Sequence, residues 1–161
     1  MPKIEIKTAI NAEIQLVFDL SRSTELHEIS TKKTNEKAIS GKTSGLFELN
    51  DKVTWRGKHF GIYQTLSVKI TEFESPTFFK DEMTKGIFAN FNHSHYFEKT
   101  DYGTLMTDCF EYKSPLGFLG RIADFLFLKK YMTNFLLKRN QVIKEFAETE
   151  KCKQIFDLPK D

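Results

Sequence analysis

The sequence predicts an α+β fold in which a curved, seven-stranded antiparallel sheet wraps around one long C-terminal helix. Two observations carry this prediction. Residues 38–115 form successive segments of alternating apolar and polar side chains with short turns between them, which is typical of an antiparallel meander. Residues 116–148 contain no proline and repeat apolar side chains at spacings of three and four, which indicates one amphipathic helix with a bend expected near Lys129-Lys130.

The chain before residue 38 is predicted to form one further strand and two short helices. Residues 3–10 alternate apolar with charged side chains, which indicates a strand with one wet face. Asn11 is a suitable N-cap for a helix that follows it, and residues 24–29 favour a second helix. Residues 30–37 are polar and are predicted to form a loop.

Turn-forming residues delimit the other six strands. Proline cannot donate to a strand ladder, so Ser75-Pro76 is expected to end one strand, and Asn50-Asp51 is expected to form a turn. The expected strands span residues 44–49, 52–60, 62–73, 77–84, 87–98 and 104–112. Because the turns are short, strands that are adjacent in sequence are expected to pair in the sheet.

The composition predicts a single domain over residues 1–161, with its core at about 3–148. The 24 Lys and Arg against 22 Asp and Glu give a net charge of only +2, which argues against a nucleic-acid binder. No apolar run approaches the roughly 20 residues of a membrane-spanning helix, and the first residues lack the apolar block of a signal peptide. With Cys109 and Cys152 as its only cysteines, the protein is expected to be cytoplasmic.

A curved sheet under one helix is expected to enclose a cavity, and the period of two indicates which side chains face it. Residues 87–98 place Phe91, His93 and His95 in the more apolar, inward-facing set. Taking residues 99–102 as a four-residue loop fixes the register with the last strand. The expected inner pairs are His95 with Met106, His93 with Asp108, and Phe91 with Phe110.

The same alternation selects the inner side chains of the preceding strands. These are Val53, Trp55, Gly57, His59, Ile62, Gln64, Leu66, Val68, Phe79, Asp81 and Met83. With two residues of the helix, the predicted ligand-binding set is Trp55, His59, Gln64, Phe79, Asp81, Met83, Phe91, His93, His95, Met106, Asp108, Phe110, Phe125 and Met132. His27, on a short helix, is interpreted as a structural histidine.

Several segments of the chain resemble one known superfamily. They are Phe18-Asp19-Leu20, residues 54–61, 76–83, 86–88, 91–95 and 103–108, and Ser114-Pro115-Leu116-Gly117. From about residue 3 to 148 the chain resembles the SRPBCC superfamily, also called START-like, helix-grip or polyketide cyclase-like, and within it the small bacterial stand-alone ligand-binding type. The resemblance implies a helix-grip fold. Members include lipid carriers, hormone receptors, aromatic cyclases and quinone-binding chaperones, and no motif here selects one of these.

The favoured hypothesis is binding or transport of an apolar or aromatic small molecule, such as a lipid, quinone or polyketide-like compound. An alternative is an enzyme of the cyclase, dehydratase or hydrolase type, in which Asp108 orients His93 as general base. His93 and His95 with His59, Asp81 or Asp108 offer possible zinc ligands, but their spacing is not diagnostic, so no metal and no cofactor are predicted.

Residues 116–128 carry more apolar side chains than one face of a helix can bury. Three interpretations stay open for this segment: a mobile gate at the cavity, a dimer face, or a contact with a membrane surface. The chain is accordingly predicted to be a monomer or a homodimer. A partner-protein module that uses Phe118 and Phe125 is the third functional hypothesis.

Overall fold

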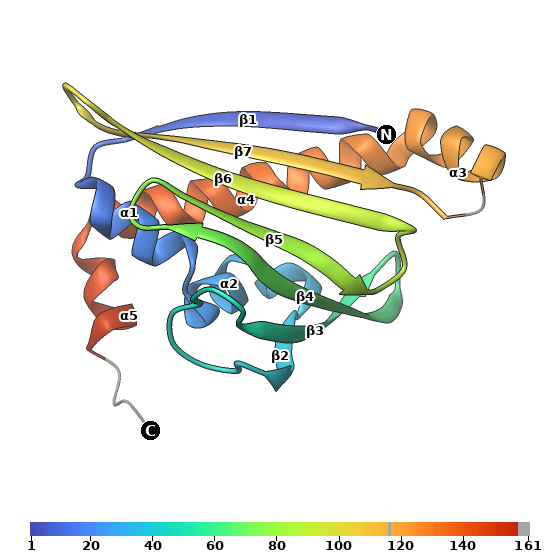
Figure 1. Ribbon diagram of the computed structural model, residues 1–161, viewed down its shortest axis with the longest axis horizontal. Coiled ribbons are helices and arrows are strands. Elements are labelled where there is room, and N and C mark those ends of the chain that lie inside the picture. The colour runs from blue at the N-terminus through green and yellow to red at the C-terminus, as the bar shows by residue number, and fades with distance from the viewer. Residues whose placement is uncertain (116, 158–161) are drawn as a thin grey trace.

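The computed structural model describes residues 1–115 and 117–157, and its elements are labelled in Figure 1. In chain order they are β1 (Lys3–Ile10), α1 (Ile14–Ser21), α2 (Thr24–Ser30), the 3-10 turn η1 (Lys32–Thr34), β2 (Lys37–Gly41), β3 (Lys52–His59), β4 (Ile62–Glu74), β5 (Phe78–Lys85), β6 (Asn90–Thr100), β7 (Gly103–Lys113), α3 (Gly117–Ala123), the π-helical turn η2 (Asp124–Leu128), α4 (Lys129–Ala147), the 3-10 turn η3 (Glu150–Cys152) and α5 (Lys153–Phe156).

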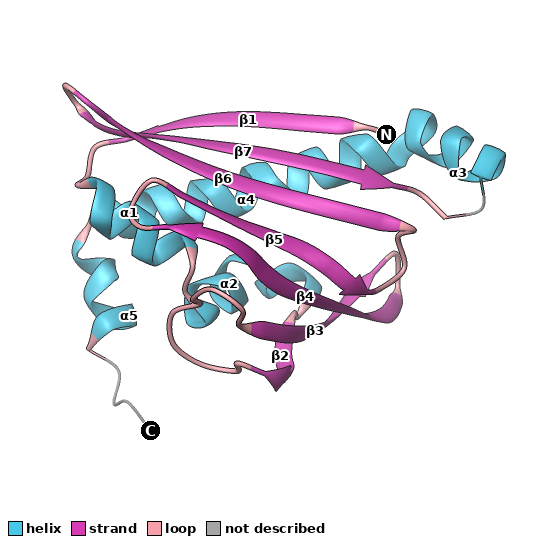
Figure 2. Cartoon of the chain, viewed as in Figure 1, coloured by secondary structure: helices cyan, strands magenta, loops and turns pink. Residues whose placement is uncertain are grey.

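The seven strands form one antiparallel sheet in the order β1-β7-β6-β5-β4-β3-β2. The helix α4 runs along one face of the sheet and packs against β1, α1 and α2 (Figure 2). Phe18 of α1, Phe97 of β6 and Ile143 of α4 are buried in the core that these elements share. The predicted fold class, an antiparallel sheet of seven strands with a long C-terminal helix, is confirmed.

The second strand lies earlier in the chain than predicted, at β2 and not at residues 44–49. The backbone of this segment pairs instead with the junction between α1 and α2. The backbone N–H of Phe47 donates to Arg22 O at 2.9 Å, and that of Thr24 donates to Gly45 O at 3.0 Å. The Phe47 side chain is buried, and its ring lies edge-on to that of Trp55 in β3. Its apolar character therefore reflects burial beside the sheet, which a strand pattern cannot distinguish from a position within it.

The predicted N-cap of the first helix is wrong. The helix α1 begins at Ile14, its N-cap is Glu13, and no side chain caps it. The backbone N–H of Asn11 donates instead to Glu148 Oε1 at 2.9 Å, which ties the end of β1 to the end of α4. In α2 the cap follows the usual rule, because Ser23 accepts from the backbone N–H of Leu26.

The register between β6 and β7 differs from the prediction by two residues. Thr100 pairs with Gly103, so the hairpin has a two-residue turn in place of the expected four-residue loop. His95 therefore lies opposite Asp108, and His93 lies opposite Phe110. A shift of two preserves the face of every side chain. The inward orientation of both histidines is as predicted, while their direct cross-strand partners are not.

The ribbon of the C-terminal helix runs without interruption from α3 into α4 (Figure 1), but its winding changes between them. Leu116, its predicted first residue, lies outside the described residues. The five residues of η2 wind as a π-helix, and this turn ends where the sequence predicts a bend, at Lys129. A π-helical turn changes the face that later residues present. Most of the buried inner face belongs to α4 and includes Leu136, Arg139 and Asn140.

Candidate functional site

A cavity of about 170 Å³ lies between the inner face of the sheet and α4. Its wall is mainly apolar and aromatic. The sheet contributes Val53, Trp55, Leu66, Val68, Ile70, Phe79, Phe91 and Phe110, and the C-terminal helix contributes Leu128, Met132, Phe135 and Leu136. The expectation of a space between helix and sheet is met, and the space is large enough for a small molecule.

Ten of the predicted ligand-binding residues line this cavity. They are Trp55, His59, Gln64, Phe79, Asp81, Phe91, His93, His95, Phe110 and Met132. That these side chains contact a ligand remains a prediction. Ile62, expected on the same face of β4, is 66% exposed at the start of its strand and does not contribute to the wall.

Four predicted residues lie elsewhere, for different physical reasons. Met106 and Asp108 are fully buried behind the wall, in β7. Met83 packs against the edge of the core. Phe125, in η2, is 90% exposed. The prediction that Phe125 lines the cavity is therefore wrong.

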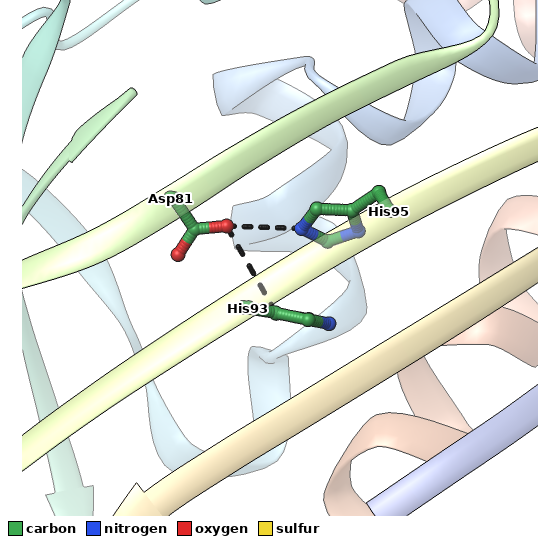
Figure 3. A group of neighbouring side chains, drawn as sticks. All are labelled: Asp81, His93 and His95. Carbon is green, nitrogen blue, oxygen red and sulfur yellow. Dashed lines mark hydrogen bonds and ion pairs between the residues drawn. The ribbon is translucent and has the colours of Figure 1, made fainter. Parts of the chain in front are cut away.

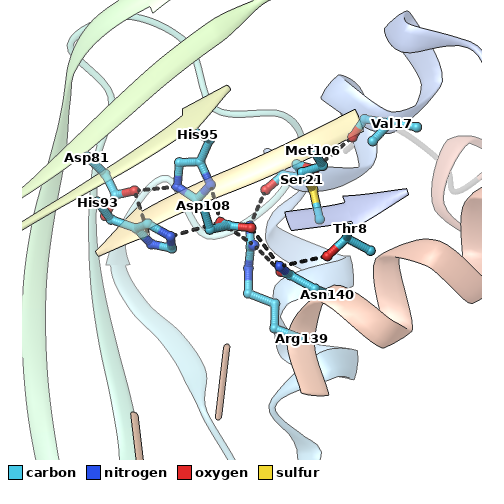
Figure 4. Close-up of polar contacts among 10 residues, drawn as sticks. All are labelled: Thr8, Val17, Ser21, Asp81, His93, His95, Met106, Asp108, Arg139 and Asn140. Carbon is cyan, nitrogen blue, oxygen red and sulfur yellow. Dashed lines mark hydrogen bonds and ion pairs between the residues drawn. The ribbon is translucent and has the colours of Figure 1, made fainter. Parts of the chain in front are cut away.

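One polar cluster, here called the Asp108 cluster, joins the sheet to α4 (Figure 4). It consists of Asp81, His93, His95, Asp108, Arg139 and Asn140. His93 Nε2 lies 2.9 Å from Asp108 Oδ1, and His95 Nε2 lies 2.9 Å from Asp81 Oδ1. Nδ1 of His95 is also 2.9 Å from Asp108 Oδ1, but its N–H does not point at that oxygen, so this contact is an ion pair only. Asp108 Oδ2 accepts from Asn140 Nδ2 at 2.6 Å.

The Asp108 cluster holds two carboxylates against two buried cations. Burial alone raises the pKa of Asp108, but His93 and His95 outweigh burial and hold that pKa well below its usual range. Burial opposes the charged form of His95 too, yet Asp108 and Asp81 raise its pKa, which favours the imidazolium. Burial and the nearby charge of His95 lower the pKa of His93, which favours the neutral imidazole. Arg139 supplies the second positive charge.

A second polar group in the wall, here called the Glu36 cluster, consists of His27, Glu36, His59 and Tyr131. Glu36 Oε2 lies 2.7 Å from His27 Nε2, and its Oε1 lies 3.0 Å from His59 Nε2. His59 Nδ1 lies 2.8 Å from the hydroxyl of Tyr131. Burial raises the pKa of Glu36, but the contacts with both imidazoles outweigh burial and lower it from 4.5 to about 2.

The sequence pattern does not predict most of the Glu36 cluster. Glu36 falls in the predicted polar loop, and His27 is expected to be structural, whereas both line the cavity. Gly57 is one of the predicted inner residues, and it leaves room for Glu36, since a Cβ there would lie 2.4 Å from Glu36 Cγ. No periodic pattern links these residues, because they come from separate elements of the fold.

The geometry of the cavity suits binding of an aromatic ligand and coordination of a metal ion. The aromatic wall suits a ring, and the polar clusters provide partners for its oxygen atoms. Three potential metal-ligand atoms, from Asp81, His93 and His95, lie within 4.8 Å of one another. None of the helices within residues 1–115 and 117–157 is long and apolar enough to cross a membrane.

The architecture is the helix-grip fold, and known structures share it. No family model matches the sequence, and no curated protein matches it either. TTHA0849 from Thermus thermophilus superposes with a TM-score of 0.73 at 15% identity, over 89% of this chain and 95% of that one. Major latex-like protein 151 from Panax ginseng gives a TM-score of 0.68 at 15% identity, over 92% and 98%. CV1439 from Chromobacterium violaceum gives 0.69 at 6% identity, over 91% and 98%. At such identities the similarity shows the fold alone, which is the fold that the SRPBCC resemblance implies.

Proposed function

We propose that the chain binds one small aromatic molecule in the cavity and orients a hydroxyl group of that molecule at the Asp108 cluster. The observation that carries this proposal is a cavity of about 170 Å³ whose apolar wall is interrupted by two polar clusters. An apolar cavity of roughly 150 Å³ accommodates benzene. A phenol or the ring of a quinol therefore fits.

The hydroxyl preference follows from the neutral state of His93. Its Nε2–H donates to Asp108, so Nδ1 carries the free lone pair and accepts a hydrogen bond. His93 and Asp81 both line the cavity, so a ligand hydroxyl can donate to either. The apolar surface of the ring supplies affinity at about 25 cal/mol per Å² before the cost of association, and the hydroxyl supplies orientation.

The test is ligand-observed NMR with benzene, phenol and hydroquinone. We expect all three to bind, with phenol and hydroquinone tighter than benzene, and we expect His93→Ala to weaken that preference. Leu66→Trp fills the cavity and should abolish binding, while Ile62→Trp places the same ring on the same strand outside the wall and should leave it unchanged. Absence of binding by the wild-type chain would reject the proposal.

A second candidate function is general-base catalysis, and one observation favours it. His93 lines the cavity, is a neutral imidazole, and is oriented by a carboxylate at 2.9 Å. A positioned histidine of this kind accelerates proton transfer by roughly 100- to 10,000-fold. Hydrolysis of 4-nitrophenyl acetate by the wild type, lost in His93→Ala and in Leu66→Trp, would support catalysis. A rate equal to that in buffer would exclude this substrate class.

We also propose that the exposed side of the C-terminal helix docks on an anionic membrane surface. This apolar end consists of Phe118, Leu119, Ile122, Phe125, Leu126 and Phe127, all of them exposed. The exposed charges among residues 117–130 are those of Arg121, Lys129 and Lys130. The one acidic residue there, Asp124, accepts a hydrogen bond from Ser114. Exposed apolar side chains flanked by basic ones match a lipid surface that carries negative charge.

The free thiols of Cys109 and Cys152 support a cytoplasmic location for the protein.

Flotation with lipid vesicles tests the membrane proposal. Vesicles of phosphatidylglycerol should carry the wild type, and vesicles of phosphatidylcholine should carry much less. The double variant Phe118→Ser, Phe125→Ser should stay unbound. Tyr102→Ser is the matched control, because Tyr102 is 87% exposed in the turn at the opposite end of the molecule (Figure 1). A dimer that the same double variant dissociates, without flotation, would assign the surface to a second copy of the chain.

A further inference from the structure

Three potential metal ligands meet on the inner face of β5 and β6 (Figure 3). Asp81 pairs with His93 across the strands, and His95 follows on the same face. Asp81 Oδ1 lies 2.9 Å from His95 Nε2 and 4.0 Å from His93 Nδ1. Two ligand atoms of a tetrahedral zinc ion are about 3.3 Å apart, since each lies roughly 2.0–2.1 Å from the metal. These two distances bracket this value, and all three donor atoms lie within 4.8 Å of one another, so side-chain rotations can bring them onto one ion.

The ring nitrogens that face away from this point both lie close to one carboxylate, and His93 Nε2–H donates to it. His93 Nε2 and His95 Nδ1 each lie 2.9 Å from Asp108 Oδ1. Metal-binding histidines generally donate their other ring N–H to such a carboxylate, which fixes the tautomer and the ring orientation. Asp108 is itself fixed by Asn140. The two atoms beside Asp81 that would serve as ligands are His93 Nδ1 and His95 Nε2. Metal binding would release the Nε2 proton that His95 shares with Asp81.

The surroundings leave a fourth coordination position open. Asp81, His93 and His95 all line the cavity, so water or a ligand oxygen can approach from there. Arg139 and Asp81 lie on opposite sides of Asp108 (Figure 4), and the guanidinium donates to Ser21 O at 2.9 Å. The arginine thus does not occupy the position between the three donors.

The donor atoms of the Glu36 cluster do not converge on one point, although this cluster also contains two imidazoles and a carboxylate. Its two histidines contact opposite oxygens of Glu36, which keeps their nitrogens from a common point. Among residues 1–115 and 117–157, Asp81, His93 and His95 are the one group of three whose donor atoms converge.

We propose that Asp81, His93 and His95 bind one divalent ion of the zinc class, with the fourth position open to the cavity. Two imidazole nitrogens and a carboxylate oxygen suit zinc or cobalt, and three protein ligands with an open position are typical of catalytic zinc sites. The site needs only protein atoms, so it goes beyond the proposed aromatic ligand. Either proposal can fail without the other.

Cobalt titration of chelator-treated full-length protein tests the site directly. We expect one equivalent of Co²⁺ to give the intense visible absorption of a tetrahedral ion, and one equivalent of Zn²⁺ to remove it. Isothermal calorimetry with Zn²⁺ alone gives the stoichiometry independently. Asp108→Asn retains the three ligands but weakens their orientation, so it should reduce the affinity about 10- to 100-fold.

His93→Ala and His95→Ala should each abolish the cobalt spectrum. Asp81→Asn is a conservative third variant, which keeps the side-chain size if an alanine variant fails to fold. Cys109→Ser is the control, because its thiol adjoins Asp108 in sequence but faces the other side of the sheet from the cavity. A wild-type protein that gives no tetrahedral spectrum, or a spectrum that survives the histidine variants or depends on Cys109, would overturn the proposal.

Discussion

Beside the cavity, two carboxylates each lie between two imidazoles, and together they involve all four histidines of the chain. The Asp108 cluster is built on neighbouring strands, with support from α4. One oxygen of Asp108 lies 2.9 Å from nitrogens of both His93 and His95, and the other oxygen accepts from Asn140. Asp108 is completely buried.

The Glu36 cluster is built differently, from parts of the chain that are distant in sequence. Each oxygen of Glu36 serves one imidazole, His27 from α2 and His59 from β3, and Tyr131 of α4 completes the chain of contacts. The Asp108 cluster thus balances charge inside the core, whereas the Glu36 cluster ties a helix to the sheet. Single substitutions in the two clusters should therefore change the free energy of unfolding by different amounts.

The largest effect is expected from Asp108→Ala. This change leaves His95 and Arg139 buried without their shared counter-charge, and loss of one partner of a buried ion pair costs about 3–5 kcal/mol. Urea denaturation measures the free energy of unfolding. Glu111→Ala, on the outer face of the same strand, is the control and should change it by less than about 0.5 kcal/mol. Equal effects of both variants would contradict a buried charge balance.

The second-largest effect on the free energy of unfolding is expected from Glu36→Gln, and this effect depends on pH. The pKa of Glu36 is about 2 in the folded chain against 4.5 as its ordinary value, so its charge stabilises the fold above pH 4.5. That stabilisation, about 3 kcal/mol, is lost as the pH falls from 4.5 towards 2. Urea unfolding of the wild type and of Glu36→Gln should show a gap between their free energies of unfolding that narrows by about 2 kcal/mol from about pH 7 to pH 3. The charged and titratable groups that face Glu36 are His27, His59 and Tyr131. A gap that stays constant with pH would show that the charge of Glu36 is not responsible.

The same contrast explains how much of the site the sequence predicts. Strand alternation places His93, His95 and Asp81 on one face correctly, because a register error of two residues keeps every side chain on its face. No comparable rule connects Glu36 with His27 or His59, since the path of the chain between elements decides their contact. The prediction that Phe125 lines the cavity is wrong for a related reason. Helical periodicity does not show which part of a helix packs against the sheet.

A smaller effect is expected from Gly57→Ala, which tests the close packing of the Glu36 cluster. The added Cβ would lie 2.4 Å from Glu36 Cγ and 3.2 Å from His59 Nε2. Overpacking of this kind costs about 1–3 kcal/mol. The matched control is Gly57→Ala in a Glu36→Ala background, where the clash is relieved and the glycine change should cost less than about 0.5 kcal/mol. An equal cost in both backgrounds would mean that backbone effects, and not Glu36, set the penalty.

The smallest effect is expected from Tyr131→Phe, which removes only the hydroxyl that lies 2.8 Å from His59 Nδ1. A hydrogen bond of this type contributes about 0.5–1.5 kcal/mol to the free energy of unfolding. Tyr102→Phe, at an exposed turn, removes the same hydroxyl where it has no structural role, and should change the stability by much less. Because Tyr131 links α4 to β3, its loss should also raise amide hydrogen exchange at the start of α4 more than in the strands of the Asp108 cluster. Equal exchange in both regions would indicate that the Glu36 cluster does not fasten the helix to the sheet.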